Sequence, residues 1–99
     1  MKKRIYLAGK ITNNPNYYIE FLKAEVDVRL RYPNAVVLNP ARTIARIDGL
    51  MHEEYMELCK VMLKFSDTGA LLPNWKDSNG AIEEMKYAEK LGKKIIYLK

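Results

Sequence analysis

The pattern of apolar and polar residues along the chain predicts strands that alternate with helices. Continuous apolar runs with the length of buried strands occupy residues 4–8, 35–38, 68–72 and 94–98. The first run ends at Gly9 and the second at Asn39, and both residues favour a turn after a strand. Because one helical segment separates each strand from the next, the pattern indicates an α/β domain built on a parallel sheet.

The helices are predicted from apolar residues that recur at intervals of three or four positions. The first stripe contains Tyr18, Phe21, Leu22, Val26 and Leu30. The second contains Tyr55, Leu58, Met62 and Phe65, and the third contains Ala81, Met85, Ala88 and Leu91. Residues 41–50 have a mixed composition, so we expect irregular structure there.

The expected topology is a four-stranded, flavodoxin-like parallel sheet of order 2-1-3-4, with helices on both faces in a three-layer sandwich. A chain of 99 residues has the length of one small domain, so residues 1–99 are assigned to a single unit. In this strand order the carboxyl ends of the first and third strands are neighbours. Residues 6–10 and residues 73–84 should therefore face each other across one cleft.

The polar turn at residues 78–84 is the first candidate for a functional site. It opens the third helix, and the N-terminus of a helix attracts anions. Glu84 lies on the apolar stripe of this helix, three positions after Ala81 and four before Ala88. Glu83 points about 100° away, toward solvent. A carboxylate on an apolar stripe is costly unless it meets solvent in a cleft or a ligand, which makes Glu84 the candidate.

The net charge and its distribution along the chain limit the classes of binding partner that we expect. The 17 basic and 12 acidic residues give a net charge of +5, which suits an anionic small ligand, weak nucleic-acid contact or an ordinary soluble surface. No block of five or more like charges occurs, so a nucleic acid is not the expected partner. No run is apolar enough for a transmembrane segment, and no signal peptide is recognised, so no membrane partner is expected.

The single cysteine and the single histidine limit redox and metal chemistry. Cys59 permits no internal disulfide, which suits a reducing cytoplasm, and we expect it to be a buried residue of the second helix. His52 stands beside Glu53 and Glu54, but a metal site needs more converging ligands. We therefore expect no metal and no cofactor, since no dinucleotide-binding fingerprint or Walker-type phosphate loop occurs.

Four segments taken together resemble one known family. They are Ile5-Tyr6-Leu7-Ala8-Gly9, Leu38-Asn39-Pro40-Ala41, Leu71-Leu72-Pro73-Asn74-Trp75 and Ser78-Asn79-Gly80-Ala81-Ile82-Glu83-Glu84. Their order and spacing resemble the nucleoside 2-deoxyribosyltransferase-like superfamily, in particular its small phage and bacterial members. The resemblance covers nearly the whole chain, and it implies cleavage of the bond between base and sugar in nucleosides or nucleotides.

The resemblance also implies roles for individual residues. The family's nucleophilic glutamate follows a loop glycine by four positions, which matches Glu84 after Gly80. The family's strand-one tyrosine, which contacts this glutamate, matches Tyr6. A serine six positions before the glutamate binds the 5′-phosphate in nucleotide-cleaving members, and it matches Ser78. The expected catalytic residues are therefore Glu84 and Tyr6.

The expected substrate-binding residues are Gly9, Lys10, Trp75, Ser78, Asn79 and Gly80. Gly9 and Gly80 would let the backbone approach the sugar. Lys10 stands where related small proteins often have proline, and it either meets a phosphate or points to solvent. Trp75 either stacks on a base or packs at a subunit contact.

One departure from the family pattern concerns catalysis directly. Active members usually carry an aspartate in the second helix, and the matching position here is Cys59. A thiol does not replace a carboxylate that positions a base or transfers a proton.

The leading hypothesis is an N-glycosidase or deoxyribosyltransferase, and the alternatives are a nucleotide-binding module without turnover and a protein-interaction domain. The small core also predicts a homodimer or higher oligomer, through faces of the first two helices that carry Tyr17, Tyr18, Tyr55 and Met62.

Overall fold

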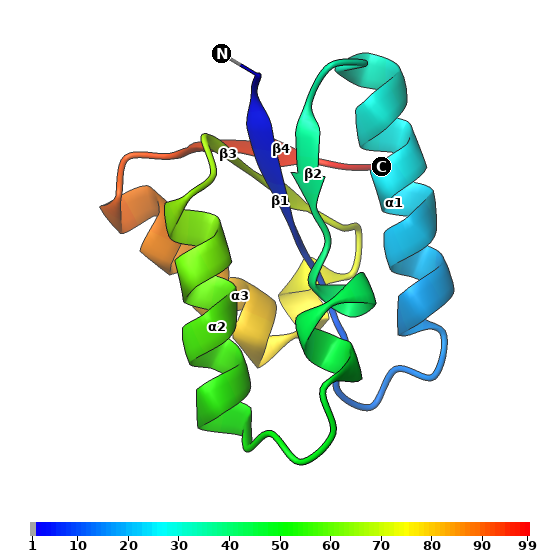
Figure 1. The fold of residues 1–99 in the computed structure, drawn as a ribbon, viewed down its shortest axis with the longest axis vertical. Helices are drawn as coiled ribbons and strands as arrows, with labels where there is room; N and C mark the ends of the chain where they lie inside the picture. The colour runs from blue at the N-terminus through cyan, green and yellow to red at the C-terminus, as the bar shows by residue number, and fades with distance from the viewer. Residues whose placement is uncertain (1) are drawn as a thin grey trace.

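The computed structural model describes residues 2–99, which form four strands and three helices in alternation (Figure 1). The strands are β1 (Arg4–Ala8), β2 (Val36–Leu38), β3 (Thr68–Leu71) and β4 (Lys94–Tyr97). The helices are α1 (Tyr17–Arg31), α2 (His52–Lys64) and α3 (Asn79–Lys90). Short 3₁₀ turns occupy Pro40–Arg42, Ile44–Arg46 and Trp75–Asp77.

The four strands form one parallel sheet in the order β2-β1-β3-β4. Tyr6 lies opposite Gly69, and Ala8 lies opposite Leu71, so β1 and β3 end at the same level. The predicted flavodoxin-like topology is therefore confirmed. The loops that leave β1 and β3 start side by side at one edge of the sheet.

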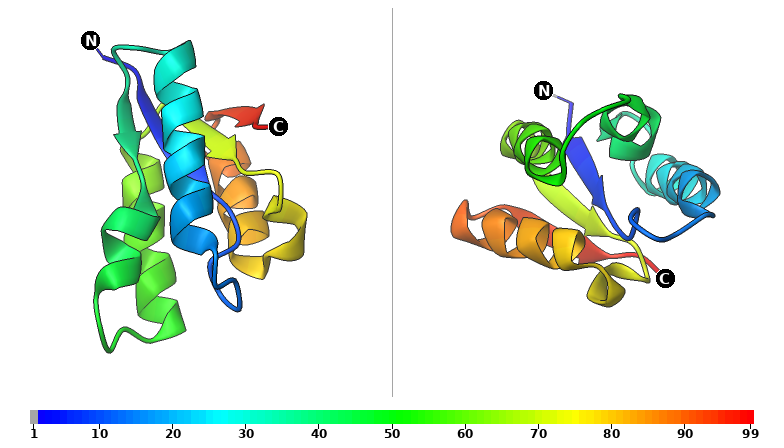
Figure 2. Two further views of the ribbon diagram at one scale, coloured as in Figure 1. Left: turned by 90° about the vertical axis from the view of Figure 1, so that its right-hand side faces the viewer. Right: turned by 90° about the horizontal axis from the view of Figure 1, so that it is seen from below.

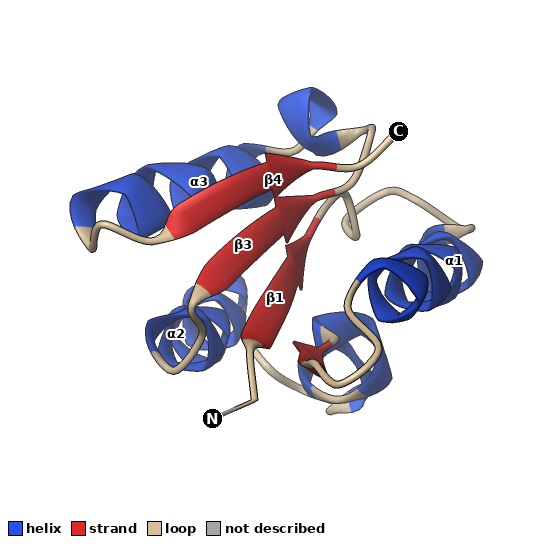
Figure 3. Ribbon diagram, turned by 90° about the horizontal axis from the view of Figure 1, so that it is seen from above, coloured by secondary structure: helices blue, strands red, loops and turns tan. Residues whose placement is uncertain are grey.

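Helices cover both faces of the sheet, with α1 on one side and α2 and α3 on the other (Figures 2 and 3). Side chains alternate between the faces of a strand, and β1 divides its residues accordingly. Ile5 and Leu7 join the core beneath α1, whereas Tyr6 and Ala8 join the core beneath α2 and α3. The position of Tyr6 in β1 therefore decides which helices its side chain meets.

The predicted buried stripes of the three helices are partly wrong, and on the third Leu91 is exposed and lies just after α3. On α1, Val26 and Leu30 are 57% and 76% exposed, and the helix instead buries Phe21, Ala24, Glu25 and Val28. On α2, Leu58 and Phe65 are exposed, and the buried residues are Met56, Cys59 and Leu63. The buried residues of each helix recur at intervals of three or four positions, so the face that packs on the core is offset from the predicted one.

The second strand is shorter and less buried than predicted. Ala35 lies before it, and β2 is an edge strand in which Val36 is exposed. After β2, Asn39 accepts a hydrogen bond from the Ala41 N–H at 3.0 Å and so starts the first 3₁₀ turn. Residues 41–50 are irregular as expected, apart from the two 3₁₀ turns after β2.

Candidate active site

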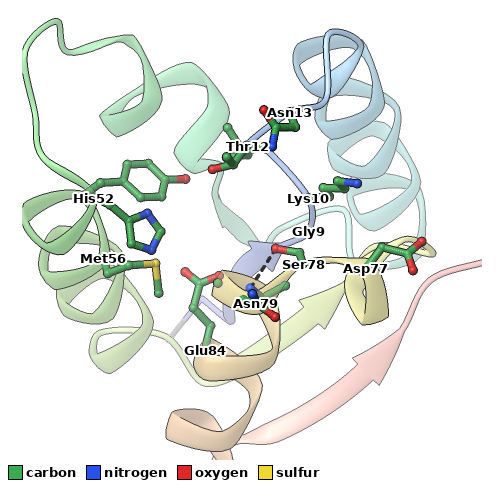
Figure 4. Close-up of a pocket in the computed structure, with 14 residues that line it drawn as sticks. Gly9, Lys10, Thr12, Asn13, His52, Met56, Asp77, Ser78, Asn79 and Glu84 are labelled. Atoms are coloured by element: carbon green, nitrogen blue, oxygen red, sulfur yellow. Dashed lines mark hydrogen bonds between the residues drawn. The ribbon is translucent and has the colours of Figure 1, made fainter.

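A cleft of about 300 Å³ opens at the carboxyl edge of the sheet (Figure 4). It lies between the loop after β1, the first turns of α2 and the start of α3. The lining residues are Gly9, Lys10, Ile11, Thr12, Asn13, His52, Tyr55, Met56, Asp77, Ser78, Asn79, Gly80, Ala81 and Glu84. The two segments that the sheet order predicted to meet, after β1 and after β3, both contribute to it.

The N-terminus of α3 supplies hydrogen-bond donors to this cleft. Ser78 is the N-cap, and its Oγ accepts a hydrogen bond from the Ala81 N–H at 3.1 Å. The Ile82 N–H donates to the Ser78 carbonyl at 3.0 Å. The first N–H groups of a helix have no partner within the helix, so those of Asn79 and Gly80 remain available to a ligand. The Ser78 hydroxyl hydrogen is also free to donate, because its oxygen acts as the acceptor in the cap.

Glu84 lies one turn further along α3 and is 6% exposed. Its Oε2 accepts a hydrogen bond from the Tyr6 hydroxyl, which comes from β1 on the same face of the sheet. Tyr6 is buried beneath the glutamate and does not line the cleft. No Lys or Arg side chain of residues 2–99 forms an ion pair with Glu84. The arrangement holds one carboxylate oxygen in place and directs the group toward the cleft.

The surroundings of Glu84 make it a weak acid. Burial raises its pKa to about 7, and the hydrogen bonds from Tyr6 and the Cys59 thiol offset only part of that effect. Burial also raises the pKa of Cys59 to about 12, with a further contribution from the nearby Glu84 charge. The pKa of Tyr6 is raised by burial and then by Glu84. Near neutral pH the carboxylate is therefore the group of this cluster that changes its charge.

Asn74 links the two loops that form the mouth of the cleft. Its Oδ1 accepts a hydrogen bond from the Lys10 N–H at 3.1 Å, and its Nδ2 donates to Glu20 Oε1 at 3.1 Å. Asn14 Nδ2 donates to the same Glu20 oxygen and to the Lys10 carbonyl, both at 2.8 Å. These bonds fix the backbone after β1 against the backbone after β3, so the cleft is held open before any ligand binds.

The structure brings together most of the residues expected to bind substrate, with one exception. Gly9, Lys10, Ser78, Asn79 and Gly80 all line the cleft. Trp75 does not line it. Its ring packs on the core beneath α2 and α3 and lies 5.9 Å from the Tyr97 ring, centroid to centroid. Contact between Trp75 and a base therefore has no support in the geometry, because the 3₁₀ turn carries its side chain toward β4.

The two glycines of the cleft, Gly9 and Gly80, differ in how much space their neighbours leave for a side chain. A Cβ on Gly9 would lie 2.9 Å from the Leu72 Cβ and 3.2 Å from Asn74 Oδ1, so close packing of the two loops excludes a side chain there. A Cβ on Gly80 would meet the Met56 sulfur at 3.4 Å, which is a tight but tolerable contact. Gly9 is thus required by the fold, and Gly80 keeps the cleft wide.

Several residues of the cleft were not predicted as site residues. His52, Tyr55 and Met56 reach it from the first turns of α2. His52 was considered only as a metal ligand, and no group of three side chains suited to a metal occurs among residues 2–99. The helical spacing of Tyr55 and Cys59, four positions apart, was a usable signal, because both belong to the face of α2 that meets Glu84.

These observations define an α/β protein with a buried carboxylate and a helix N-terminus in one cleft. A family model described as "Domain of unknown function (DUF4406)" matches residues 3–97, so the chain belongs to that family. None of the curated proteins compared with the chain is a match. None of the helices described in residues 2–99 has the length and hydropathy needed to span a membrane.

The fold is shared with a solved structure, a 2-desoxiribosyltransferase from Leishmania mexicana. The TM-score is 0.69 and the sequence identity is 21%, over 97% of this chain. The chain spans 63% of the length of that protein. The likeness establishes the deoxyribosyltransferase-type fold, and it agrees with the predicted topology.

Proposed function

We propose that this protein cleaves the bond between base and sugar in a nucleoside or nucleotide, as an N-glycosidase or deoxyribosyltransferase. The observation that carries the proposal is Glu84, a buried carboxylate that has no ion-pair partner among residues 2–99, is oriented by Tyr6 and is open to the cleft. Such a group can attack the anomeric carbon and form a glycosyl ester, which water or a second base then resolves. Within the superfamily we assign the chain to the small phage and bacterial branch, and the single free Cys59 supports a cytoplasmic setting.

Tyr6 has a positioning role in this proposal. Its hydroxyl donates to one carboxylate oxygen and leaves the other free to attack. The raised pKa of Glu84, about 7, means that protonation competes with nucleophilic attack near neutral pH. The ionisation of Glu84 should therefore give the pH profile of base release an acidic limb that rises with its midpoint at about 7.

The decisive experiment measures release of free base from a panel of nucleosides and nucleoside monophosphates by chromatography. Wild type should release base, and Glu84→Gln should not, because the amide keeps the shape of the side chain but cannot attack. Glu83→Gln is the matched control, since Glu83 pairs with Lys60 at 2.7 Å on the outer side of α3 and does not line the cleft. Equal rates for wild type and Glu84→Gln would refute the covalent mechanism.

A binding module without turnover is the second candidate. The observation in its favour is Cys59, which is buried beneath Glu84 at the position where active relatives are expected to carry an aspartate. Cys59→Asp tests it, because restoring the carboxyl group should increase a weak hydrolysis rate if its absence limits catalysis. If neither wild type nor Cys59→Asp releases base and nucleotides still raise the melting temperature, the binding module is the better description.

The cleft favours a phosphorylated ligand in this proposal. The N–H groups of Asn79 and Gly80, the Ser78 hydroxyl and the α3 dipole all suit an anion, and each contributes about 1 kcal/mol or less when exposed. Calorimetry should show tighter binding of a nucleoside 5′-monophosphate than of the nucleoside. Ser78→Ala should reduce this difference, and equal affinities in wild type would contradict an anion site.

We also infer a homodimer or higher oligomer. Of the residues expected at the interface, Tyr17, Tyr55 and Met62 pack against the cores instead. Exposed apolar side chains lie along α1 (Ile19, Val26 and Leu30) and, on the other face of the sheet, along α2 and just after it (Leu58, Val61 and Phe65). Each of these two groups is typical of a protein interface. Light scattering at micromolar concentration should report a mass above that of one chain, and a monomer would contradict the inference.

A further inference from the structure

The proposed reaction requires a proton that Glu84 does not supply. When the bond between base and sugar breaks, its electron pair remains on the base, which leaves more easily if it is protonated. Glu84 acts as the nucleophile and must be ionised at that moment. The proton has to come from another group that reaches the cleft, and the following inference rests on the proposed function.

The groups around Glu84 hold their protons too firmly for this task. Burial raises the pKa values of Tyr6 and Tyr55, and it raises the pKa of Cys59 to about 12. Tyr6 and Cys59 also lie outside the cleft. These three side chains can donate hydrogen bonds to Glu84 or to a ligand, but they are poor sources of a transferred proton near neutral pH.

His52 occupies the opposite wall of the cleft, on the first turn of α2. In Figure 4 its imidazole lies beside Met56 and points into the cavity above Glu84, whereas Asp77 and Lys10 lie at the far end beyond Ser78. Imidazole is the side chain that exchanges a proton most readily near neutral pH. Among the lining residues, His52 is therefore both suited to proton transfer and close to the side of the cleft where Glu84 lies.

A second cavity adjoins the cleft on the side of His52. It has a volume of about 320 Å³ and shares Ile11, Thr12, His52 and Tyr55 with the first cleft. Its other lining residues are the apolar side chains Ile44, Ala45, Ile47 and Leu50. With the sugar over Glu84 and a phosphate at Ser78, the flat base extends toward this apolar surface. His52 lines both cavities, so in such a complex its imidazole would face the bond between sugar and base.

We propose that His52 is the general acid that protonates the leaving base. Glu84 attacks the anomeric carbon, the carbon–nitrogen bond breaks, and the base takes the bond's electron pair and a proton from the His52 imidazolium. The products of this step are the glycosyl ester of Glu84, the neutral base and neutral imidazole. The imidazole then removes a proton from water as its oxygen attacks the same carbon, which releases the sugar and restores the Glu84 carboxylate and the imidazolium.

The test compares bases that need a proton to leave with bases that need it less or not at all. Guanosine monophosphate is paired with its 7-methyl derivative, whose positively charged base departs without a proton, and uridine monophosphate is paired with the better leaving 5-fluoro derivative. His52→Gln should reduce release of the unmodified bases by about 100-fold or more, release of 7-methylguanine by less than about threefold, and release of 5-fluorouracil by an intermediate factor. Glu84→Gln should abolish release from all four.

Glu53→Gln is the matched control, because Glu53 is the next residue of α2, is exposed and does not line the cleft. It should leave all four rates unchanged. An equal loss on both members of a pair, or no loss in His52→Gln, would overturn the assignment of His52 alone. If wild type releases no base from any of the four nucleotides, the proposed function fails and the role of His52 fails with it.

Discussion

Two glutamates of this protein are buried to nearly the same extent but have different kinds of hydrogen-bond partner. Glu25 on α1 is 5% exposed, and Glu84 on α3 is 6% exposed. Glu25 accepts hydrogen bonds at 3.0 Å from Asn39 Nδ2 and from Arg29 Nε, and Arg42 lies 3.2 Å away. Glu84 accepts a hydrogen bond from the Tyr6 hydroxyl, lies beside the Cys59 thiol, forms no ion pair within residues 2–99 and faces the open cleft.

The partners decide the acidity of each group. Burial alone would raise the pKa of Glu25, but the hydrogen bonds from Asn39 and Arg29 and the charges of Arg29 and Arg42 outweigh it, so the pKa is lowered. Burial raises the pKa of Glu84 to about 7, because the hydrogen bonds from Tyr6 and Cys59 and the more distant Lys60 charge offset only part of its effect. Both carboxylate oxygens of Glu25 are hydrogen-bonded within the fold, where they join α1 to the segment after β2. Glu84 has a carboxylate oxygen that can contact a ligand in the cleft.

The largest expected difference between the two glutamates is in turnover. Glu84→Gln should reduce base release by at least roughly 1000-fold, because a covalent route loses its nucleophile. Glu25→Gln should change the rate of the folded protein by only about twofold, since Glu25 lies outside the cleft. Chromatography of released base measures both, and a large effect in a well-folded Glu25→Gln would break the comparison.

The next effect is on stability and has a defined pH dependence. Between the ordinary pKa of 4.5 and about 7, native Glu84 keeps a proton that the unfolded chain has released, so the free energy of unfolding falls as the pH rises. The loss is complete above pH 7 and amounts to roughly 3 kcal/mol. Glu84→Gln should remove this pH-dependent loss. The variant should therefore have a higher free energy of unfolding than wild type at pH 8 and a similar one at pH 4.5. Urea denaturation at both pH values provides the measurement.

Glu25 should show the opposite dependence. Its pKa is lowered in the folded state, so its contribution to stability is present above the pKa of the unfolded chain and is lost as the pH falls through the folded value. Glu25→Ala should destabilise the protein by about 2 kcal/mol at pH 7, because the buried Asn39 amide and two arginines lose a partner. A variant as stable as wild type at pH 7 would show that the Glu25 network is dispensable.

The smallest expected effect concerns the thiol beneath Glu84. Cys59→Ser replaces a weak hydrogen-bond donor by a stronger one of similar size, which should favour the ionised carboxylate by about 1 kcal/mol or less. The pH at which base release reaches half its maximum should therefore move downward, while the maximum itself changes little. A pH–rate profile of both proteins tests this, and an upward movement would show that the thiol does not support the Glu84 charge.

The sequence by itself predicted the parallel sheet, its flavodoxin-like strand order and a candidate site. Apolar runs and helical spacing were enough to predict four parallel strands, because burial on both faces demands uninterrupted apolar residues. The sheet order then placed the segments after β1 and β3 at one edge. Glu84 was identified as a candidate from the sequence alone, because it lies on the apolar face of a helix, between Ala81 and Ala88. A carboxylate is unfavourable at such a position unless it has a function.

Only the tertiary structure decided which of the competing helix faces is buried. The sequence of α1 offers an apolar face through Val26 and Leu30, yet the fold buries Glu25, because Arg29, Asn39 and Arg42 meet its carboxylate there. Two of these partners come from a segment distant in the chain, and no helical periodicity contains that information. Burial of a charge depends on where its counter-charges arrive, which is a property of the assembled fold.

The detailed content of the cleft was likewise decided by packing. The 3₁₀ turn after β3 directs Trp75 toward Tyr97 and away from the cleft, and the start of α2 brings His52 into it. The sequence identified the residue types capable of chemistry, but the direction of each side chain depends on loop geometry that short-range patterns do not encode. Local periodicity predicts the strands and helices, whereas the partners of Glu84 follow from long-range contacts between β1, α2 and α3.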